Sequence, residues 1–146
     1  MSIKAGVMSE QQIEEFLEQA RFAIVGTNRA NGPPQQSPVW YLYDDGRIYI
    51  SVYTRSIKYK NLSRDPRISI CVAGDPPDSR AVIMTGKVEI IQRANTSSYD
   101  DLSWRLVRRY YESDDEAHSY NENTGDGTDS ALIMLKPERV LAQDYN

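Results

Sequence analysis

Residues 48–62 read IYISVYTRSIKYKNL and carry the chain from a strand directly into a short helix. Ile48, Ile50 and Val52 alternate with tyrosine and serine, which is the period-two pattern of a half-buried strand. The alternation stops at Thr54, where the pattern favours a helix. The stretch therefore predicts a strand followed at once by a helix N-terminus.

Three cations and two hydroxyls gather at this predicted helix start. Arg55, Lys58 and Lys60 carry the charges, and Thr54 and Ser56 carry the hydroxyls. Backbone N–H groups and the helix dipole favour an anion at such a position, whereas cations in a first turn are unfavourable without one. We therefore predict a phosphate site with Arg55 and Lys58 as its main ligands. The alternative is a solvated, charged helix surface.

The segments before this stretch predict a helix and a hairpin. A capping-box pattern begins a helix expected over 9–20. Two β-rich runs, over 22–27 and 35–43, are separated by the turn pair Asn31-Gly32. This spacing is typical of two antiparallel strands joined by a tight connection.

The segments after it predict mostly strands. Gly86 indicates a bulge or a close backbone approach within one of them, and the acidic segment 112–129 is expected to be a mobile loop. The predicted strands span 68–72, 81–92, 131–136 and 140–145, and a predicted amphipathic helix spans 97–112. About seven strands and three helices favour a mainly β (α+β) fold, a small antiparallel barrel with helices outside.

Composition narrows the class of protein. The 146 residues fit a single domain over 1–146, and the net charge of −4 argues against nucleic-acid binding. No apolar run approaches the ~20 residues of a membrane helix, so we expect a cytoplasmic protein without membrane contact. Cys71 is the single cysteine and lies in an apolar alternation, which predicts a buried, inert thiol. We expect no metal site.

Residues 35–41 read QQSPVWY and form the second candidate feature. Pro38 cannot donate to a strand ladder, so it indicates an edge strand or a bulge. A free strand edge can bind the rim of a flat heteroaromatic ring, which can stack near Trp40 or Tyr41. The alternative is an ordinary amphipathic strand with a proline at the sheet edge.

Catalytic side chains are scarce. His118 is the single histidine and lies in a polar segment, where it is expected to be solvent-exposed, so one chain cannot build a Ser-His triad or a multi-histidine metal centre. No Gly-x-Gly-x-x-Gly follows a strand, which argues against a Rossmann fold. A phosphate site beside an open strand edge is what a bound redox cofactor requires.

Taken together, these motifs resemble those of one flavoprotein superfamily. The residues that carry the likeness are Ser37-Pro38-Val39-Trp40-Tyr41, Asp44-Asp45-Gly46, Thr54-Arg55-Ser56-Ile57-Lys58 with Asn61-Leu62, and Asp65-Pro66-Arg67-Ile68-Ser69. In order and spacing over roughly 10–92, the chain resembles the pyridoxamine 5′-phosphate oxidase-like, split β-barrel superfamily. Within it, the chain is most similar to the flavin- or deazaflavin-dependent reductases that use coenzyme F-420.

The resemblance implies an FMN-binding type of split antiparallel β-barrel with about six to seven strands and three flanking helices. It also implies a homodimer with cofactor sites at the subunit interface. Lys58 matches the family's phosphate lysine, with Arg55 and Ser56 as its neighbours. The other cofactor-binding residues implied are Ser37, Val39 and Trp40 along the ring, Ser51 and Tyr53 at its border, and Thr54, Lys60 and Asn61 in the phosphate motif.

The implied cofactor is coenzyme F-420 (a deazaflavin) or FMN, which share a tricyclic ring and a phosphate. The additional lysine in the motif favours F-420, whose anionic tail would contact Lys60 or Arg80. The chain ends at Asn146 without the arginine-containing substrate motif of true pyridoxine and pyridoxamine 5′-phosphate oxidases, which argues against vitamin B6 oxidation.

We therefore expect an oxidoreductase that transfers hydride between the bound cofactor and an electron-poor small molecule. No catalytic side chain is assigned, although Tyr41 is a candidate for protonating the product. Two alternatives stay open: a non-catalytic carrier or storage protein for the flavin or deazaflavin, and a regulatory domain that binds an anion or a nucleotide.

Overall fold

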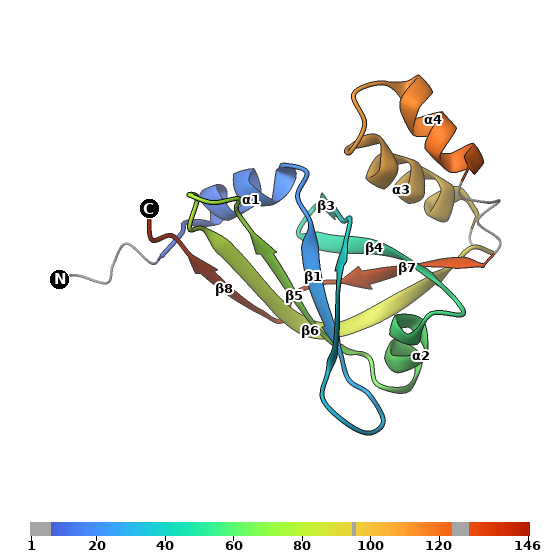
Figure 1. Ribbon diagram of the computed structural model, residues 1–146, viewed down its shortest axis with the longest axis horizontal. Coiled ribbons are helices and arrows are strands. Elements are labelled where there is room, and N and C mark those ends of the chain that lie inside the picture. The colour runs from blue at the N-terminus through green and yellow to red at the C-terminus, as the bar shows by residue number, and fades with distance from the viewer. Residues whose placement is uncertain (1–6, 95, 124–128) are drawn as a thin grey trace.

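The computed structural model describes residues 7–94, 96–123 and 129–146 (Figure 1). Over these residues it confirms the predicted mainly β, split-barrel fold. The strands are β1 (Ala23–Thr27), β2 (Gln35–Val39), β3 (Leu42–Asp44), β4 (Arg47–Tyr53), β5 (Arg67–Ala73), β6 (Ala81–Gln92), β7 (Ser130–Leu135) and β8 (Arg139–Gln143). The helices are α1 (Glu10–Glu18), α2 (Ile57–Arg64), α3 (Thr96–Arg108) and α4 (Asp114–Asn123).

The strands form one antiparallel sheet that curls on itself. Its order is β2-β1-β5-β6-β7-β4-β3, and β8 pairs with β6 beside this path. The two ends of the path, β2 and β3, are separated in sequence only by Trp40 and Tyr41. Pro38 therefore lies on an edge strand, as predicted, because among the described strands β2 pairs with β1 alone.

The core fills the inside of this curled sheet. Alternate residues of β1, β4, β5 and β7 point inward and are buried, and Phe16 and Leu17 of α1 close one end. The capping box of α1 fixes that helix, since Ser9 and Gln12 exchange both side chain to backbone hydrogen bonds. Each fully buried aliphatic side chain contributes about 1.5–3 kcal/mol to folding.

The long strand β6 belongs to two parts of the sheet. Its first half pairs with β5 and β8, and from Val88 onward it pairs with β7. Gly86 lies at this transition, where an added Cβ would lie 3.0 Å from Leu135 Cδ1 and 3.2 Å from the backbone nitrogen of Glu138. The predicted close approach at Gly86 is confirmed.

The predicted strand over 35–43 is wrong in one respect, because it is two strands. The hydroxyl of Tyr110, just after α3, accepts from the backbone N–H of Tyr41 at 3.1 Å and lies 3.2 Å from its carbonyl oxygen. Both polar backbone groups of Tyr41 thus contact a side chain instead of a neighbouring strand. The chain consequently bends between β2 and β3.

The predicted acidic loop over 112–129 is also wrong over much of its length. Residues Asp114–Asn123 form α4, so the described chain has four helices instead of three. Ser113 caps this helix, with its hydroxyl accepting from the N–H of Glu116 at 3.2 Å. Three carboxylates in the first turn suit the positive end of the helix dipole. Residues 124–128 of the predicted loop lie outside the described part.

His118 is solvent-exposed on α4, as predicted, and stacks on Trp104 of α3 with ring centroids 4.4 Å apart. Among the described helices, none combines the length and the apolar character that crossing a bilayer requires.

Candidate functional site

Helix α2 fills the split of the barrel, where it contacts both β1 and β4. Asn61 and Leu62 are its buried residues. The Asn61 side-chain amide donates to the hydroxyl of Thr27 on β1 at 3.1 Å, and both groups are buried. Asn61 therefore anchors the helix to β1. This bond also fixes the position of the first turn of α2, which carries Lys58.

Lys58 points from α2 to the edge strand β2. Its ammonium group donates to the hydroxyl of Ser37 at 3.1 Å. The side chain is half-buried, and this burial lowers the pKa of Lys58. Within the described ranges Lys58 has no ion pair with a carboxylate. A partly desolvated cation beside a hydroxyl is a favourable position for an incoming anion.

The first turn of α2 adds backbone donors to this position. Ser56 is the N-cap, and its hydroxyl accepts from the N–H of Tyr59 at 3.2 Å and donates to the carbonyl of Tyr53 at 2.7 Å. The amides of Ile57 and Lys58 have no acceptor within the helix, as is general for a first turn. We call Lys58, Ser37 and these first-turn amides the Lys58 site.

The other predicted ligands do not converge on Lys58. Arg55 is exposed, with Nη1 4.0 Å from Oδ2 of Asp129 and its guanidinium carbon 5.8 Å from the centroid of the Tyr53 ring. Lys60 is also exposed. The backbone N–H of Thr54 donates to the carbonyl of Asp129 at 2.6 Å, which holds this connection in place.

The residues predicted to lie along a ring occupy two environments. Val39 is half-buried and packs against the core, whereas Ser51 and Tyr53 are exposed on the outward face of β4. Trp40 stacks on Tyr110 with ring centroids 4.6 Å apart and planes 5° from parallel. That face of Trp40 is thus occupied by the chain itself.

An aromatic group beside Trp40 was missing from the sequence prediction. Tyr111 and Tyr120 lie 5.8 Å and 5.3 Å from the Trp40 ring, centroid to centroid. Burial raises the pKa of Tyr120, and Tyr53 is near enough to raise it further. The sequence does not place Tyr120 here, because the acidic composition of 112–129 predicts a loop. The capping pattern of Ser113 and Glu116 was the signal that could have identified α4.

The Tyr41 hydroxyl, a candidate proton donor by its position in the sequence, is hydrogen-bonded within the fold. Its buried hydroxyl donates to the carbonyl oxygens of Leu17 at 2.9 Å and Gln19 at 3.0 Å. Burial raises the pKa of Tyr41 to about 12. The phenol is therefore a structural link between the β2–β3 bend and the end of α1.

Arg80 is likewise committed elsewhere. It binds Asp78 at 2.7 Å and lies over the ring of Phe16, in the loop that follows β5. Because α2 directly precedes β5, Arg80 and Lys58 lie near opposite ends of that strand. Within one chain Arg80 is therefore paired with Asp78 and does not join the Lys58 site.

The curled antiparallel sheet, with a cation-bearing helix set into its split, defines a split-barrel protein. The family model described as pyridoxamine 5′-phosphate oxidase matches residues 9–144. The chain belongs to this family. No match was found among curated proteins.

Solved structures show the same fold. A conserved hypothetical protein of Mycobacterium tuberculosis, Rv2991, is 23% identical with a TM-score of 0.81, covering 99% of this chain and 89% of its own. A structure named F420 reductase is 23% identical with a TM-score of 0.68, covering 87% and 94%. A FAD-binding protein of Mesorhizobium loti is 17% identical with a TM-score of 0.73, covering 95% and 96%.

Proposed function

We propose that this chain is a cofactor-dependent oxidoreductase that binds a flavin or deazaflavin through a phosphate at the Lys58 site. One observation carries the proposal. The ammonium group of Lys58 is half-buried and bonded to the hydroxyl of Ser37, yet it has no carboxylate partner within the described part of the chain. A phosphate would supply the missing charge, and the free first-turn amides would add donors.

The residues around the Lys58 site fit the rest of such a cofactor. One side of the edge strand β2 pairs with no other described strand, so its backbone can hydrogen-bond the rim of a ring near Val39. Ser51 and Tyr53 on β4 would border it from the other side of the split. When bound, the cofactor supplies hydride-transfer chemistry, and the protein orients it and limits its contact with water.

We favour coenzyme F-420 over FMN. Arg55 and Lys60 are solvent-exposed next to Lys58 in sequence, where they can meet an anionic tail outside the split. The similar fold of a protein named F420 reductase supports this choice, and that of a FAD-binding protein supports the wider flavin class. The substrate class is an electron-poor, conjugated small molecule.

A binding titration tests the site. Wild-type protein is titrated with F-420 and separately with FMN, following cofactor fluorescence. Replacing Lys58→Ala removes a charge-assisted contact, so the affinity should fall about 30-fold, which corresponds to about 2 kcal/mol. Lys60→Ala is the matched control in the FMN titration, because FMN has no anionic tail beyond its phosphate, and there its effect should stay within about threefold since Lys60 is exposed.

Equal losses of FMN affinity in the two variants would show that only the general charge of the helix matters. No binding of either cofactor by the wild type would refute the proposal and favour a regulatory domain for another anion.

A non-catalytic carrier is the second candidate, and the environment of Tyr41 favours it. The hydroxyl that could protonate a product is instead bonded to two backbone carbonyls. An oxidoreductase built this way would take the proton from solvent. Turnover of a panel of quinones by the cofactor-loaded protein, above the rate of free cofactor, separates the two functions.

A further inference from the structure

The ladder between β1 and β2 ends where a tyrosine hydroxyl replaces the next pair of residues. The last paired residues are Ala23 and Val39. Extending this register by two residues would pair Arg21 with Tyr41. Instead the hydroxyl of Tyr110 lies between these two. It accepts from the N–H of Tyr41 at 3.1 Å and donates to the carbonyl oxygen of Arg21 at 2.6 Å. A side chain from beyond α3 is thus inserted between the two chain segments.

The phase of β2 determines which backbone groups point to its free side. In an antiparallel pair, the N–H and C=O groups of successive residues point alternately toward the partner strand and away from it. Pro38 has no N–H and cannot form a closely hydrogen-bonded pair with Ile24 opposite, so groups of its phase point away from β1. Trp40 lies two residues further on and shares that phase.

The bond to Tyr110 fixes the peptide that joins Trp40 to Tyr41. In a planar trans peptide, the N–H of one residue and the C=O of the residue before it point in opposite directions. Because Tyr110 holds the N–H of Tyr41, the carbonyl of Trp40 is held on the opposite side. The same tyrosine also holds the indole, since the rings of Tyr110 and Trp40 are stacked.

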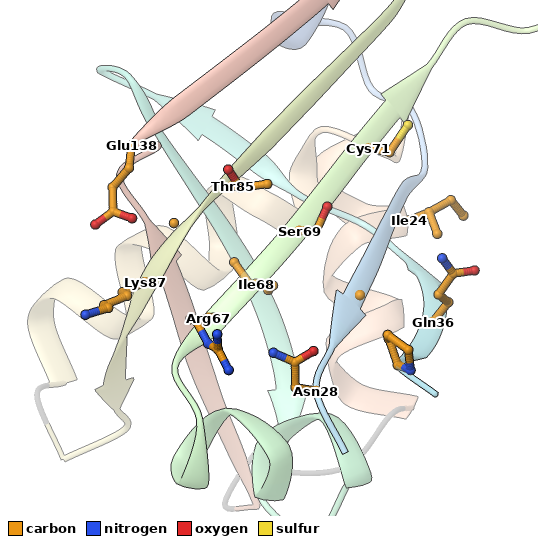
Figure 2. A pocket seen from close by; sticks show the side chains of 13 residues that line it. Ile24, Asn28, Gln36, Arg67, Ile68, Ser69, Cys71, Thr85, Lys87 and Glu138 are labelled. Carbon is orange, nitrogen blue, oxygen red and sulfur yellow. The ribbon is translucent and has the colours of Figure 1, made fainter. Parts of the chain in front are cut away.

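The earlier part of β2 is open on its outer face. Gln36 is exposed there and lies with Ile24 at one margin of a cavity of about 510 Å³, with Lys87 and Glu138 at the other margin (Figure 2). Cys71 lines the same cavity and is half-buried, not buried as predicted, because its neighbours on β5 take the inward phase. The contacts that restrain β2 are therefore strongest at its end, around Trp40.

We propose that Tyr110 is a positioning residue for the cofactor ring. This inference rests on the proposed function, in which the ring binds along the free side of β2 near Val39 and Trp40. The hydroxyl of Tyr110 keeps the peptide after Trp40 turned toward that side. Without the hydroxyl, Arg21 and Tyr41 would pair directly, and the edge presented to the ring would turn with them.

This role is separate from that of the Lys58 site. Lys58 contacts Ser37, three residues before Trp40. The hydroxyl of Tyr110 makes its bonds to Tyr41 and Arg21 instead. Two different positions along β2 would therefore hold the two ends of the cofactor, one its phosphate and the other its ring. Substitutions at the two positions should weaken binding of different parts of the cofactor.

Tryptophan fluorescence of the cofactor-free protein tests the position of Trp40 directly. The chain has two tryptophans, so every protein compared carries Trp104→Phe, which leaves Trp40 as the single indole. Tyr110→Phe keeps the ring and removes the hydroxyl, and acrylamide quenching should rise about twofold or more as the indole leaves its stack. Tyr111→Phe is the matched control. Tyr111 also contacts Trp40 with its ring but makes none of the bonds to the bend, so quenching should be unchanged.

Cofactor fragments separate positioning from a general loss of structure. Riboflavin carries the ring without a phosphate, and Tyr110→Phe should lower its affinity about tenfold. Inorganic phosphate, which competes with FMN at the Lys58 site, should keep its affinity. Lys58→Ala should show the reverse pattern. Circular dichroism shows whether each variant is folded.

Unchanged quenching in Tyr110→Phe would overturn the proposal, and so would equal losses of riboflavin and phosphate affinity, which indicate destabilisation alone. Wild-type protein that binds neither FMN nor F-420 would refute the proposed function itself. If wild type binds a cofactor and Tyr110→Phe binds it equally well, only the positioning role is wrong.

Discussion

The Lys58 site and the outer face of the sheet, where Pro38, Ile24 and Cys71 lie in one row, are on opposite sides of the same edge strand. Ser37 of β2 points to Lys58, whereas its neighbours Gln36 and Pro38 belong to the outer face. The first region is a half-buried cation with hydroxyl and amide donors, and the second is an apolar row with charges at its margin. The period of two in β2 therefore separates a polar, cationic surface from an apolar one.

This comparison shows that two regions of different chemical character can lie only one residue apart on the same strand. Shifting β2 by one residue against β1 would exchange its two faces and damage both. Each region should still respond by itself to substitutions that leave this register intact.

Asn61→Ala should have the largest effect on stability and should affect only the Lys58 site. It removes the donor to the buried hydroxyl of Thr27, so the free energy of unfolding should fall by about 1–3 kcal/mol. Cofactor affinity should fall as well, because α2 loses its anchor, while the mass in solution should be unchanged. Urea unfolding measures the first effect. Ser63→Ala, an exposed change on the same helix, is the control; a loss of similar size there would contradict the anchoring role.

Tyr41→Phe should have an intermediate effect and test whether this residue is structural. The free energy of unfolding should fall by about 1 kcal/mol, since one hydroxyl that donates to two carbonyls is lost. Because burial raises the pKa of Tyr41 to about 12, the phenol does not ionise near neutral pH. The pH profile of turnover should therefore be the same in variant and wild type. A variant that loses one limb of that profile would make Tyr41 a catalytic acid.

Lys58→Met should have the smallest effect on stability and the opposite sign. Burial lowers the pKa of Lys58, so in the cofactor-free protein its charge opposes folding. The variant should gain about 0.5 kcal/mol at pH 7, a modest value because solvent screens a half-exposed charge. Cofactor affinity should fall at the same time.

The pH dependence has a definite sign. Between the lowered pKa of folded Lys58 and the ordinary value of 10.5, the unfolded chain binds more protons, so wild-type stability rises with pH. That contribution is lost as pH falls through the folded pKa, and it should be absent from Lys58→Met. Thermal melts of both proteins from pH 7 to pH 10 measure it, and identical slopes would contradict the assignment.

Local pattern was enough to predict most strands, because alternation in β4, β5 and β6 directly reflects which face is buried. It could not reveal the bend between β2 and β3, which depends on Tyr110, 69 residues beyond Tyr41. The missed helix α4 is different, since Ser113 and Glu116 carry the same kind of capping signal as α1. In the segment 112–129 the acidic composition predicts a loop, whereas the capping pattern predicts a helix, and the structure follows the capping pattern.

The sequence also predicts part of the candidate site, namely its central pair of residues but not the arrangement of the cations around it. Lys58 and Ser37 were both expected, and the structure brings them together. Lys60 was grouped with Lys58 because the two are close in sequence, but two positions along a helix correspond to a rotation of about 200°, so the side chains point apart. Arg80 was assigned from charge alone, and only the fold shows that it pairs with Asp78 near the other end of β5.

Strand β6 has a consequence for how the molecule opens. Its backbone is hydrogen-bonded to β5 and β8 in its first half and to β7 in its second, so it joins the two parts of the sheet. Releasing it breaks three ladders at once. We expect its amides to be among the slowest to exchange with deuterated water, and to exchange only through global unfolding. The Lys58 site and the outer face of the sheet would then be lost in one cooperative step.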